Sequence, residues 1–129
     1  MPSMKIDAIT VTSGNLAASA KFYTLLGFRF PAFPSDAKHL EPMTGAGEVR
    51  LMIDERGLME SITGWPPVPP NHSSFAIKCE NPAEVDAAAA RVREAGFSVV
   101  KAPWDAFWGQ RYAIVADPDG YRVDLFAAL

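Results

Sequence analysis

The segment from residue 103 to residue 112 holds the densest group of potential ligand-binding side chains in the sequence. Within nine residues it carries four aromatic rings, those of Trp104, Phe107, Trp108 and Tyr112. Exposed tryptophan is costly unless its ring packs on something, so an ordinary surface loop does not account for all four. Aromatic walls of this kind stack on flat, conjugated or cationic molecules. The segment therefore predicts a surface that binds an aromatic or drug-like small molecule.

Arg111 lies inside the same segment and has two interpretations. A guanidinium can anchor a carboxylate or phosphate of a ligand, because its N–H groups match the geometry of those anions. It can also form an ion pair within the protein, with Asp105 and Asp117 as candidates along the chain. Both interpretations stay open on the sequence alone.

Two similar series of elements must position these residues. In the first half, the patterns predict a strand over 6–13, a helix over 16–26, a strand beginning at 28–30, a weak strand over 38–42 and a strand over 48–54. In the second half, they predict a strand over 72–79, a helix over 82–95, and strands over 97–101, 111–117 and 121–126. Residues 57–71 contain four closely spaced prolines and predict a stiff linker.

Each half thus reads as one β-α-β-β-β unit of about 60 residues, which is too small to bury a core alone. We expect a single domain over residues 1–129, with repeat 1 over 4–56 and repeat 2 over 72–129. The expected fold class is α+β, with the two tandem units forming a curved mixed sheet around a cavity.

Composition narrows the classes of protein and partner. The chain has 129 residues, 49% hydrophobic and 21% charged, which is the balance of a globular protein. Its net charge of -3 and lack of a basic run argue against nucleic acid as a partner. The single cysteine, Cys79, cannot form an internal disulfide and is expected in the core of a strand. Without an apolar stretch of about 18 to 20 residues or a signal-peptide pattern, we expect a cytoplasmic protein with no membrane partner.

Two runs of residues resemble a known superfamily. The run N-L-A-A-S-A-K-F-Y followed by L-G-F, over 15–28, is similar to a helix motif of the vicinal oxygen chelate superfamily. The runs W-G-Q-R-Y and D-P-D-G-Y-R-V-D-L, within 108–125, look like the ending of the same superfamily, especially of its bleomycin-resistance branch. The superfamily also includes glyoxalase I and extradiol dioxygenases. Because one fold hosts several activities there, the resemblance implies the fold more strongly than any function.

Metal-dependent members draw ligands from the first and last strands of each repeat, and this resemblance points to four positions here. They hold Ala8, Arg50, His72 and Asp124. Ala8 has no donor atom and a guanidinium does not bind cations. His72 and Asp124 are two donors, fewer than the three that a catalytic zinc requires. We therefore expect no metal cofactor, although His39 could restore the count if its side chain turned inward.

The resemblance gives two main hypotheses of function. The first is a metal-free protein that sequesters an aromatic or drug-like ligand, such as an antibiotic, in a cavity between the repeats. Its expected ligand-binding residues are Arg50, Met52, His72, Trp104, Trp108, Arg111, Tyr112 and Asp124. The second is a metal-dependent lyase or dioxygenase of the glyoxalase type, with His72 and Asp124 among its ligands.

Three further expectations accompany these hypotheses. Metal-free acid–base catalysis by His72 and Asp124 stays open, so the sequence does not decide whether the protein is an enzyme. An inward-facing Arg50 needs a partner, either Asp124 or an anionic group of the ligand. Members of the superfamily commonly pair units of two chains, which implies a homodimer.

Overall fold

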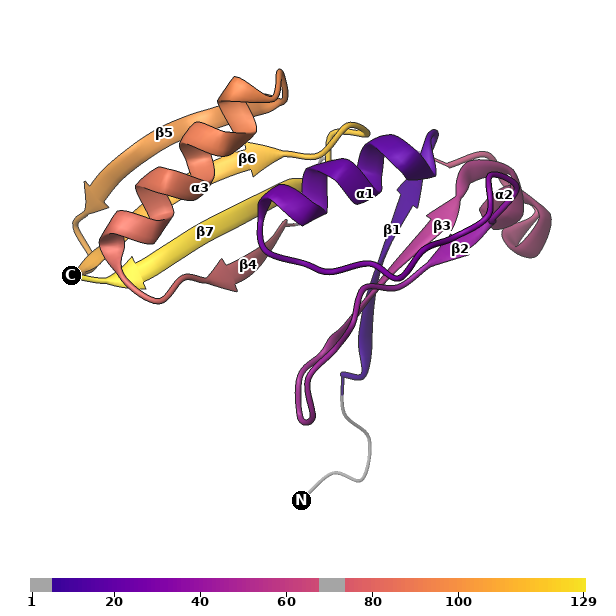
Figure 1. The fold of residues 1–129 in the computed structure, drawn as a ribbon, viewed down its shortest axis with the longest axis horizontal. Coiled ribbons are helices and arrows are strands. Elements are labelled where there is room, and N and C mark those ends of the chain that lie inside the picture. The colour runs from indigo at the N-terminus through magenta and orange to yellow at the C-terminus, as the bar shows by residue number, and fades with distance from the viewer. Residues whose placement is uncertain (1–5, 68–73) are drawn as a thin grey trace. The chain divides into compact units, whose positions relative to one another are not determined.

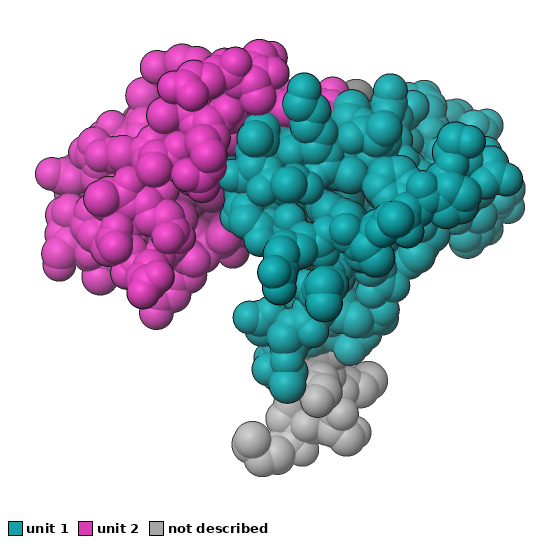
Figure 2. Space-filling model, in the orientation of Figure 1, with its two compact units in different colours: residues 1–68 teal, residues 69–129 magenta. Residues whose placement is uncertain are grey.

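The computed structural model describes residues 6–67 and 74–129. The chain divides into two units, residues 1–68 and 69–129, which are coloured separately in Figure 2. The division falls within the segment 57–71 that the sequence predicts as a linker. Each unit has its own sheet and its own covering helix (Figure 1).

Unit 1 consists of β1 (Ala8–Ser13), α1 (Leu16–Leu25), β2 (His39–Leu40), β3 (Arg50–Glu55) and α2 (Arg56–Thr63). Its three strands lie in the order β1-β3-β2. The outer strand β1 runs parallel to β3, and the two-residue strand β2 runs antiparallel to it. The first and last strands of the unit are therefore direct neighbours.

Local sequence explains where α1 begins and ends. The side chain of Asn15 accepts a hydrogen bond from the N–H of Ala18, 3.0 Å away, which satisfies one free donor of the first turn. After the helix, Gly27 adopts a φ of +99°, a conformation that other residues rarely take. The inner face of α1 buries Phe22 and Tyr23 completely.

Helix α1 packs against β3 and covers the face of the sheet that carries its buried apolar side chains. Val11, Leu51 and Ile53 are buried, and the buried hydroxyl of Ser13 on β1 lies 2.7 Å from that of Ser19 on α1. Because side chains alternate along a strand, the residues between these point to the opposite face. We call that face the open face of unit 1; it carries Ala8, Thr10, Thr12, Arg50, Met52 and Asp54.

Two predictions for unit 1 are wrong. Residues 28–30 do not form a strand, although the backbone N–H of Met43 donates to the carbonyl of Arg29 over 2.8 Å. The first part of the predicted linker is helix α2, because Glu55 accepts hydrogen bonds from the N–H groups of two first-turn residues, Gly57 and Leu58. The helix ends at Gly64, with a φ of +79°, before the prolines begin.

Unit 2 consists of β4 (Ser74–Lys78), α3 (Pro82–Glu94), β5 (Ser98–Ala106), β6 (Gln110–Ala116) and β7 (Arg122–Ala128). Its sheet has the order β4-β7-β6-β5, with β4 parallel to β7 and the other neighbours antiparallel. The predicted β-α-β-β-β order of the second half is confirmed. The α+β fold class of the chain is confirmed as well, although the first sheet has three strands and not four.

The helix α3 packs on one face of the second sheet and defines its core (Figure 1). Asn81 caps its start by accepting from the N–H of Glu84 at 2.9 Å, and Pro82 occupies the first turn, as predicted. Along strands β6 and β7, every second side chain is buried against the helix. They are Val85, Ala88, Ala89 and Val92 on the helix, and Ala113, Val115, Val123, Leu125 and Ala127 on the sheet.

The strand β5 is longer than predicted. It continues to Ala106 through two irregularities in its pairing with β6, between Val99 and Trp104. Pro103 lies in this irregular stretch, where a missing N–H donor is tolerated, so part of the segment between the predicted strands 97–101 and 111–117 is a distorted strand. Cys79 is buried, as expected, just beyond the end of β4. No helix in the described parts of the chain is long and apolar enough to cross a membrane.

Candidate functional site

Five aromatic side chains gather on the face of the second sheet that α3 does not cover. Tyr112 of β6 and Phe126 of β7 alternate with residues buried under the helix, and Trp104 of β5 is the register partner of Tyr112. Trp108, from the hairpin between β5 and β6, has its ring centroid 5.3 Å from that of Tyr112 and 6.0 Å from that of Trp104. With Phe107, these residues form what we call the aromatic face.

The rings of the aromatic face contact one another in a chain. Tyr112 is central, with Trp104 at 5.5 Å and Phe126 at 6.3 Å between ring centroids. Most of the contacts are edge to face, a favourable geometry for aromatic pairs. The predicted grouping of Trp104, Trp108 and Tyr112 is thus formed within unit 2.

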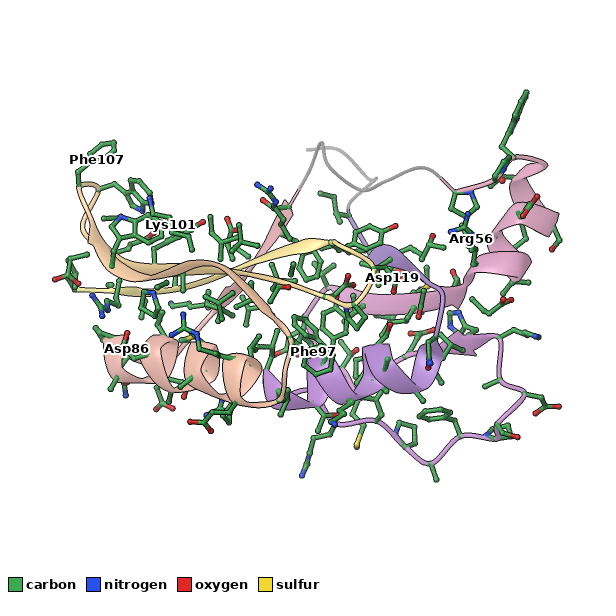
Figure 3. All side chains as sticks on the ribbon, turned by 90° about the horizontal axis from the view of Figure 1, so that it is seen from above. Arg56, Asp86, Phe97, Lys101, Phe107 and Asp119 are labelled. Atoms are coloured by element: carbon green, nitrogen blue, oxygen red, sulfur yellow. The ribbon has the colours of Figure 1, made fainter. Side chains whose placement is uncertain are left out.

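The tip of the hairpin holds its aromatic residues out from the sheet. Gly109 has a φ of +88°, which allows the chain to reverse in a short turn. Phe107 at that tip is 97% exposed and projects from the end of the hairpin in Figure 3. Trp108 is 49% exposed, and its indole N–H donates to Gln110 over 2.8 Å. A large part of the ring surface is therefore accessible to a ligand.

Two charged side chains border the aromatic face. The ammonium of Lys101 lies 4.0 Å from the centre of the Trp104 ring, a cation–π contact. The hydroxyl of Tyr112 donates to Asp124 Oδ2 over 2.6 Å. Burial, followed by the hydrogen bond to the Asp124 carboxylate, raises the pKa of Tyr112 to about 12. The phenol is thus a hydrogen-bond donor across the ordinary pH range.

Arg111 does not belong to the aromatic face. Its guanidinium binds Asp86 of helix α3 at 2.9 Å and Asp105 at 3.1 Å. Contact with α3 places the side chain on the helix-covered face, opposite to Tyr112. The predicted ion pair with Asp105 is confirmed, whereas the carboxylate of Asp117 accepts from the N–H groups of its own turn. We therefore drop Arg111 as a ligand anchor of this face.

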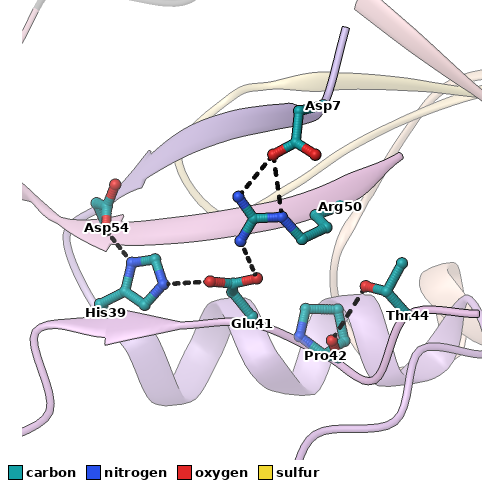
Figure 4. A network of polar contacts seen from close by, with 7 residues as sticks. All are labelled: Asp7, His39, Glu41, Pro42, Thr44, Arg50 and Asp54. Atoms are coloured by element: carbon teal, nitrogen blue, oxygen red, sulfur yellow. Dashed lines mark hydrogen bonds and ion pairs between the residues drawn. The ribbon is translucent and has the colours of Figure 1, made fainter. Parts of the chain in front are cut away.

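The open face of unit 1 carries a continuous polar network (Figure 4). Arg50 donates to Asp7 Oδ2 through Nη2 at 2.8 Å and to Glu41 Oε1 through Nη1 at 2.8 Å. His39 links the other oxygen of Glu41, at 2.8 Å, to the carboxylate of Asp54. Within unit 1, the partners of the Arg50 guanidinium are therefore Asp7 and Glu41.

The network gives His39 a different role from that of an isolated surface histidine. Its side chain is 43% exposed, as expected at a rim, but both ring nitrogens contact carboxylates. The hydrogen bonds to Asp54 and then Glu41 raise the pKa of His39, while the hydrogen bond from His39 lowers the pKa of Glu41. Sequence reasoning missed Glu41, although the spacing of His39 and Glu41 by two residues favours side chains on the same side.

Of the four positions to which the resemblance points, two hold residues that cannot bind a metal cation. Ala8 offers no donor atom, and Arg50, its register partner, presents a cation held by two carboxylates. Asp124 is a donor, and His72 lies outside the described residues. Within residues 6–67 and 74–129, no group of three or more His, Cys, Asp or Glu side chains could hold a metal ion.

Solved structures show how widely this fold occurs. A hypothetical protein from S. aureus superimposes with a TM-score of 0.81 at 24% sequence identity, over 99% of this chain and 95% of its own. A glyoxalase-related enzyme from Fulvimarina pelagi gives a TM-score of 0.81 at 21% identity, over 95% and 86%. A glyoxalase/bleomycin resistance protein/dioxygenase from Nocardioides gives 0.74 at 25% identity, over 100% and 86%. No curated protein sequence matches the chain closely enough to count as a relative.

Sequence places the chain in a family as well. Residues 5–125 match the model of the glyoxalase/bleomycin resistance protein/dioxygenase superfamily. The chain belongs to this superfamily, which confirms the resemblance at that level. The match does not single out the bleomycin-resistance branch.

Proposed function

We propose that this protein binds a flat, aromatic small molecule on the aromatic face of unit 2 and sequesters it without the help of a metal. The observation that carries this proposal is the cluster of the exposed Trp108 with the half-buried Trp104 and Tyr112 beside the carboxylate of Asp124. Exposed aromatic surface of this extent is costly in water, and a stacked ligand would cover it.

The Asp124 side of the aromatic face favours a ligand that also carries a cation or a hydrogen-bond donor, whereas the Lys101 ammonium lies over the Trp104 ring at the other side. Asp124 uses Oδ2 to accept from Tyr112, and among the described residues no donor lies within hydrogen-bond distance of Oδ1. Tyr112 keeps its proton to a pH of about 12, so it holds the carboxylate in place without competing as an anion. Each ring that stacks on the ligand adds about 0.5 to 1.5 kcal/mol beyond its buried area.

The proposal also includes three expected ligand-binding residues beyond those of the aromatic face, namely Arg50, Met52 and His72. Arg50 and Met52 share the open face of unit 1, and His72 is supported by the resemblance alone. The metal-dependent lyase or dioxygenase stays as the alternative. The donor set counts against it, because one of the three described ligand positions bears a donor that suits a cation.

A fluorescence titration tests the proposal, because the chain has three tryptophans and two belong to the aromatic face. The probe is ethidium, a planar aromatic cation, followed by a panel of aromatic antibiotics and of glutathione adducts of dicarbonyl compounds. We expect Trp104→Ala and Trp108→Ala each to weaken binding by about tenfold. Trp65→Phe is the matched control, since Trp65 is 77% exposed in unit 1 and should leave binding unchanged.

Two results would contradict sequestration on this face. The first is an equal effect of all three tryptophan variants, which would indicate non-specific stacking. The second is turnover of a dicarbonyl adduct by metal-loaded protein, which would favour the lyase.

The expected homodimer is part of the proposal and rests on the resemblance. Light scattering coupled to size-exclusion chromatography should give twice the chain mass of 14.0 kDa. A mass equal to that of one chain would contradict the homodimer, and the binding site would then consist of residues from one chain.

A further inference from the structure

The carboxylate of Glu41 is held between two cationic side chains from different segments. Its Oε1 accepts from Arg50 Nη1 at 2.8 Å, and its Oε2 accepts from His39 Nε2 at 2.8 Å. One oxygen therefore meets each cation, which is the two-point contact that a bound carboxylate ligand makes with a basic site. Figure 4 shows the three side chains converging on the open face of unit 1.

Both donors are fixed in direction by other groups. His39 Nδ1 contacts Asp54, which is buried, so the ring cannot rotate without losing that bond. Arg50 directs Nε and Nη2 at Asp7, which leaves Nη1 for Glu41. Because ionised carboxylates can only accept, the His39 ring donates to both of them only when both of its nitrogens are protonated and the ring is positively charged. Two oriented cationic donors thus point at one position.

Glu41 can leave that position by rotation of its own side chain. Backbone contacts hold the chain on both sides of Glu41. Leu40 pairs with Ile53 in the sheet, and the N–H of Met43 donates to the carbonyl of Arg29. The side chain of Glu41 is 31% exposed, and among the described residues its carboxylate is held by His39 and Arg50. No backbone rearrangement is needed to empty the space between the cations.

We propose that His39 and Arg50 form a binding site for the carboxylate group of a small molecule, and that Glu41 occupies it in the absence of ligand. Asp7 and Asp54 balance the two cations from outside and keep the donors aligned. The tethered Glu41 is present at a high effective concentration, so it lowers the apparent affinity for a free carboxylate. This site stands independently of the aromatic face of unit 2.

Glu41→Ala opens the site and allows a direct measurement with acetate as the probe. We follow the Hε1 resonance of His39 by NMR and the melting temperature, against sodium chloride at equal ionic strength. Without acetate, the variant should show a lower pKa for His39 than the wild type, since one hydrogen bond that raises it is lost. Acetate should restore that pKa and, at ten times its Kd, raise the melting temperature by roughly 4 °C.

Matched proteins make the result specific. Acetate should bind Glu41→Ala at least about tenfold more tightly than the wild type. His72 is the other histidine in the sequence, and its resonance serves as an internal reference for general effects of salt. In a second variant, Glu41→Ala combined with Arg50→Met, acetate should no longer restore the pKa of His39. If Glu41→Ala does not fold, Glu41→Gln keeps the shape of the side chain and should give the same response at smaller amplitude.

Several outcomes overturn the proposal. One is an acetate response no larger than that of chloride. Another is equal restoration by phosphate, which would make the pair a general anion site. A response that persists without Arg50 would also exclude the two-point contact. Loss of ligand binding by Trp104→Ala does not bear on this test, so the two proposals fail separately.

Discussion

Tyr112 donates its phenolic hydrogen to Asp124 between neighbouring strands of the second sheet, over 2.6 Å. The hydrogen bond joins an aromatic ring at the centre of the aromatic face to the carboxylate beside it. A ligand that stacks on the rings would therefore meet a carboxylate already held in position, which reduces the ordering cost of binding.

The ionisation of Tyr112 is the first prediction. Its raised pKa means that the folded state keeps the proton up to a pH of about 12, whereas an unfolded tyrosine loses it near 10. Its contribution to stability is complete below about pH 10 and is lost as pH rises through about 12. A difference titration of ultraviolet absorbance, wild type minus Tyr112→Phe, should show this late midpoint. In Asp124→Asn the midpoint should fall; an unchanged midpoint would mean that the carboxylate does not contribute.

The stability that His39 provides should decrease with increasing pH. Asp54 and Glu41 face its ring and raise its pKa, with Arg50 on the far side of Glu41. The contribution is therefore complete below the unfolded value of about 6.5 and disappears as pH rises through the folded pKa. Urea unfolding at a series of pH values should show that the difference in unfolding free energy between wild type and His39→Gln becomes smaller as the pH rises. His72→Gln should leave the pH dependence in place, and a constant gap for His39→Gln would contradict the prediction.

The ion pair between Arg111 and Asp86 should matter for stability and not for ligand binding. It joins strand β6 to helix α3 on the covered side of the sheet. We expect Asp86→Asn to lower the melting temperature by a few degrees and to leave the affinity for ethidium within about twofold of the wild type. If Asp86→Asn lost most of its affinity for ethidium while its melting temperature stayed unchanged, Arg111 would have to be considered a ligand-binding residue again.

Metal uptake should be weak. Protein purified without chelator and titrated with nickel, zinc or iron should show no stoichiometric binding, because Ala8 and Arg50 stand at two of the superfamily's ligand positions. Elemental analysis and calorimetry check this. One metal per chain that is lost on His72→Ala would contradict the proposal and support the lyase.

The sequence was informative where local chemistry decides the structure. Asn15, Gly27 and Asn81 marked helix ends correctly, because a cap needs particular side chains or a positive φ. The helix α2 was missed because its sequence begins and ends near glycines and leads into prolines. The side-chain cap from Glu55, which starts it, has no strong signature.

The candidate site was predictable in its aromatic part alone. Trp104, Trp108 and Tyr112 are close in sequence, and one hairpin brings them together. The partners of Arg50 were not predictable in the same way, since Asp7 is 43 positions away and depends on the parallel pairing of β1 with β3. Alternation along a strand does assign Arg111 to the face opposite its neighbour Tyr112.

In each unit the first strand pairs in parallel with the last, β1 with β3 and β4 with β7. During synthesis on the ribosome, neither sheet can therefore be completed before its final strand has emerged. Because the amino-terminal part of a chain emerges first, β1 and β3 are both available to pair before β7 has emerged. Unit 1 can therefore complete its sheet before unit 2 can complete its own.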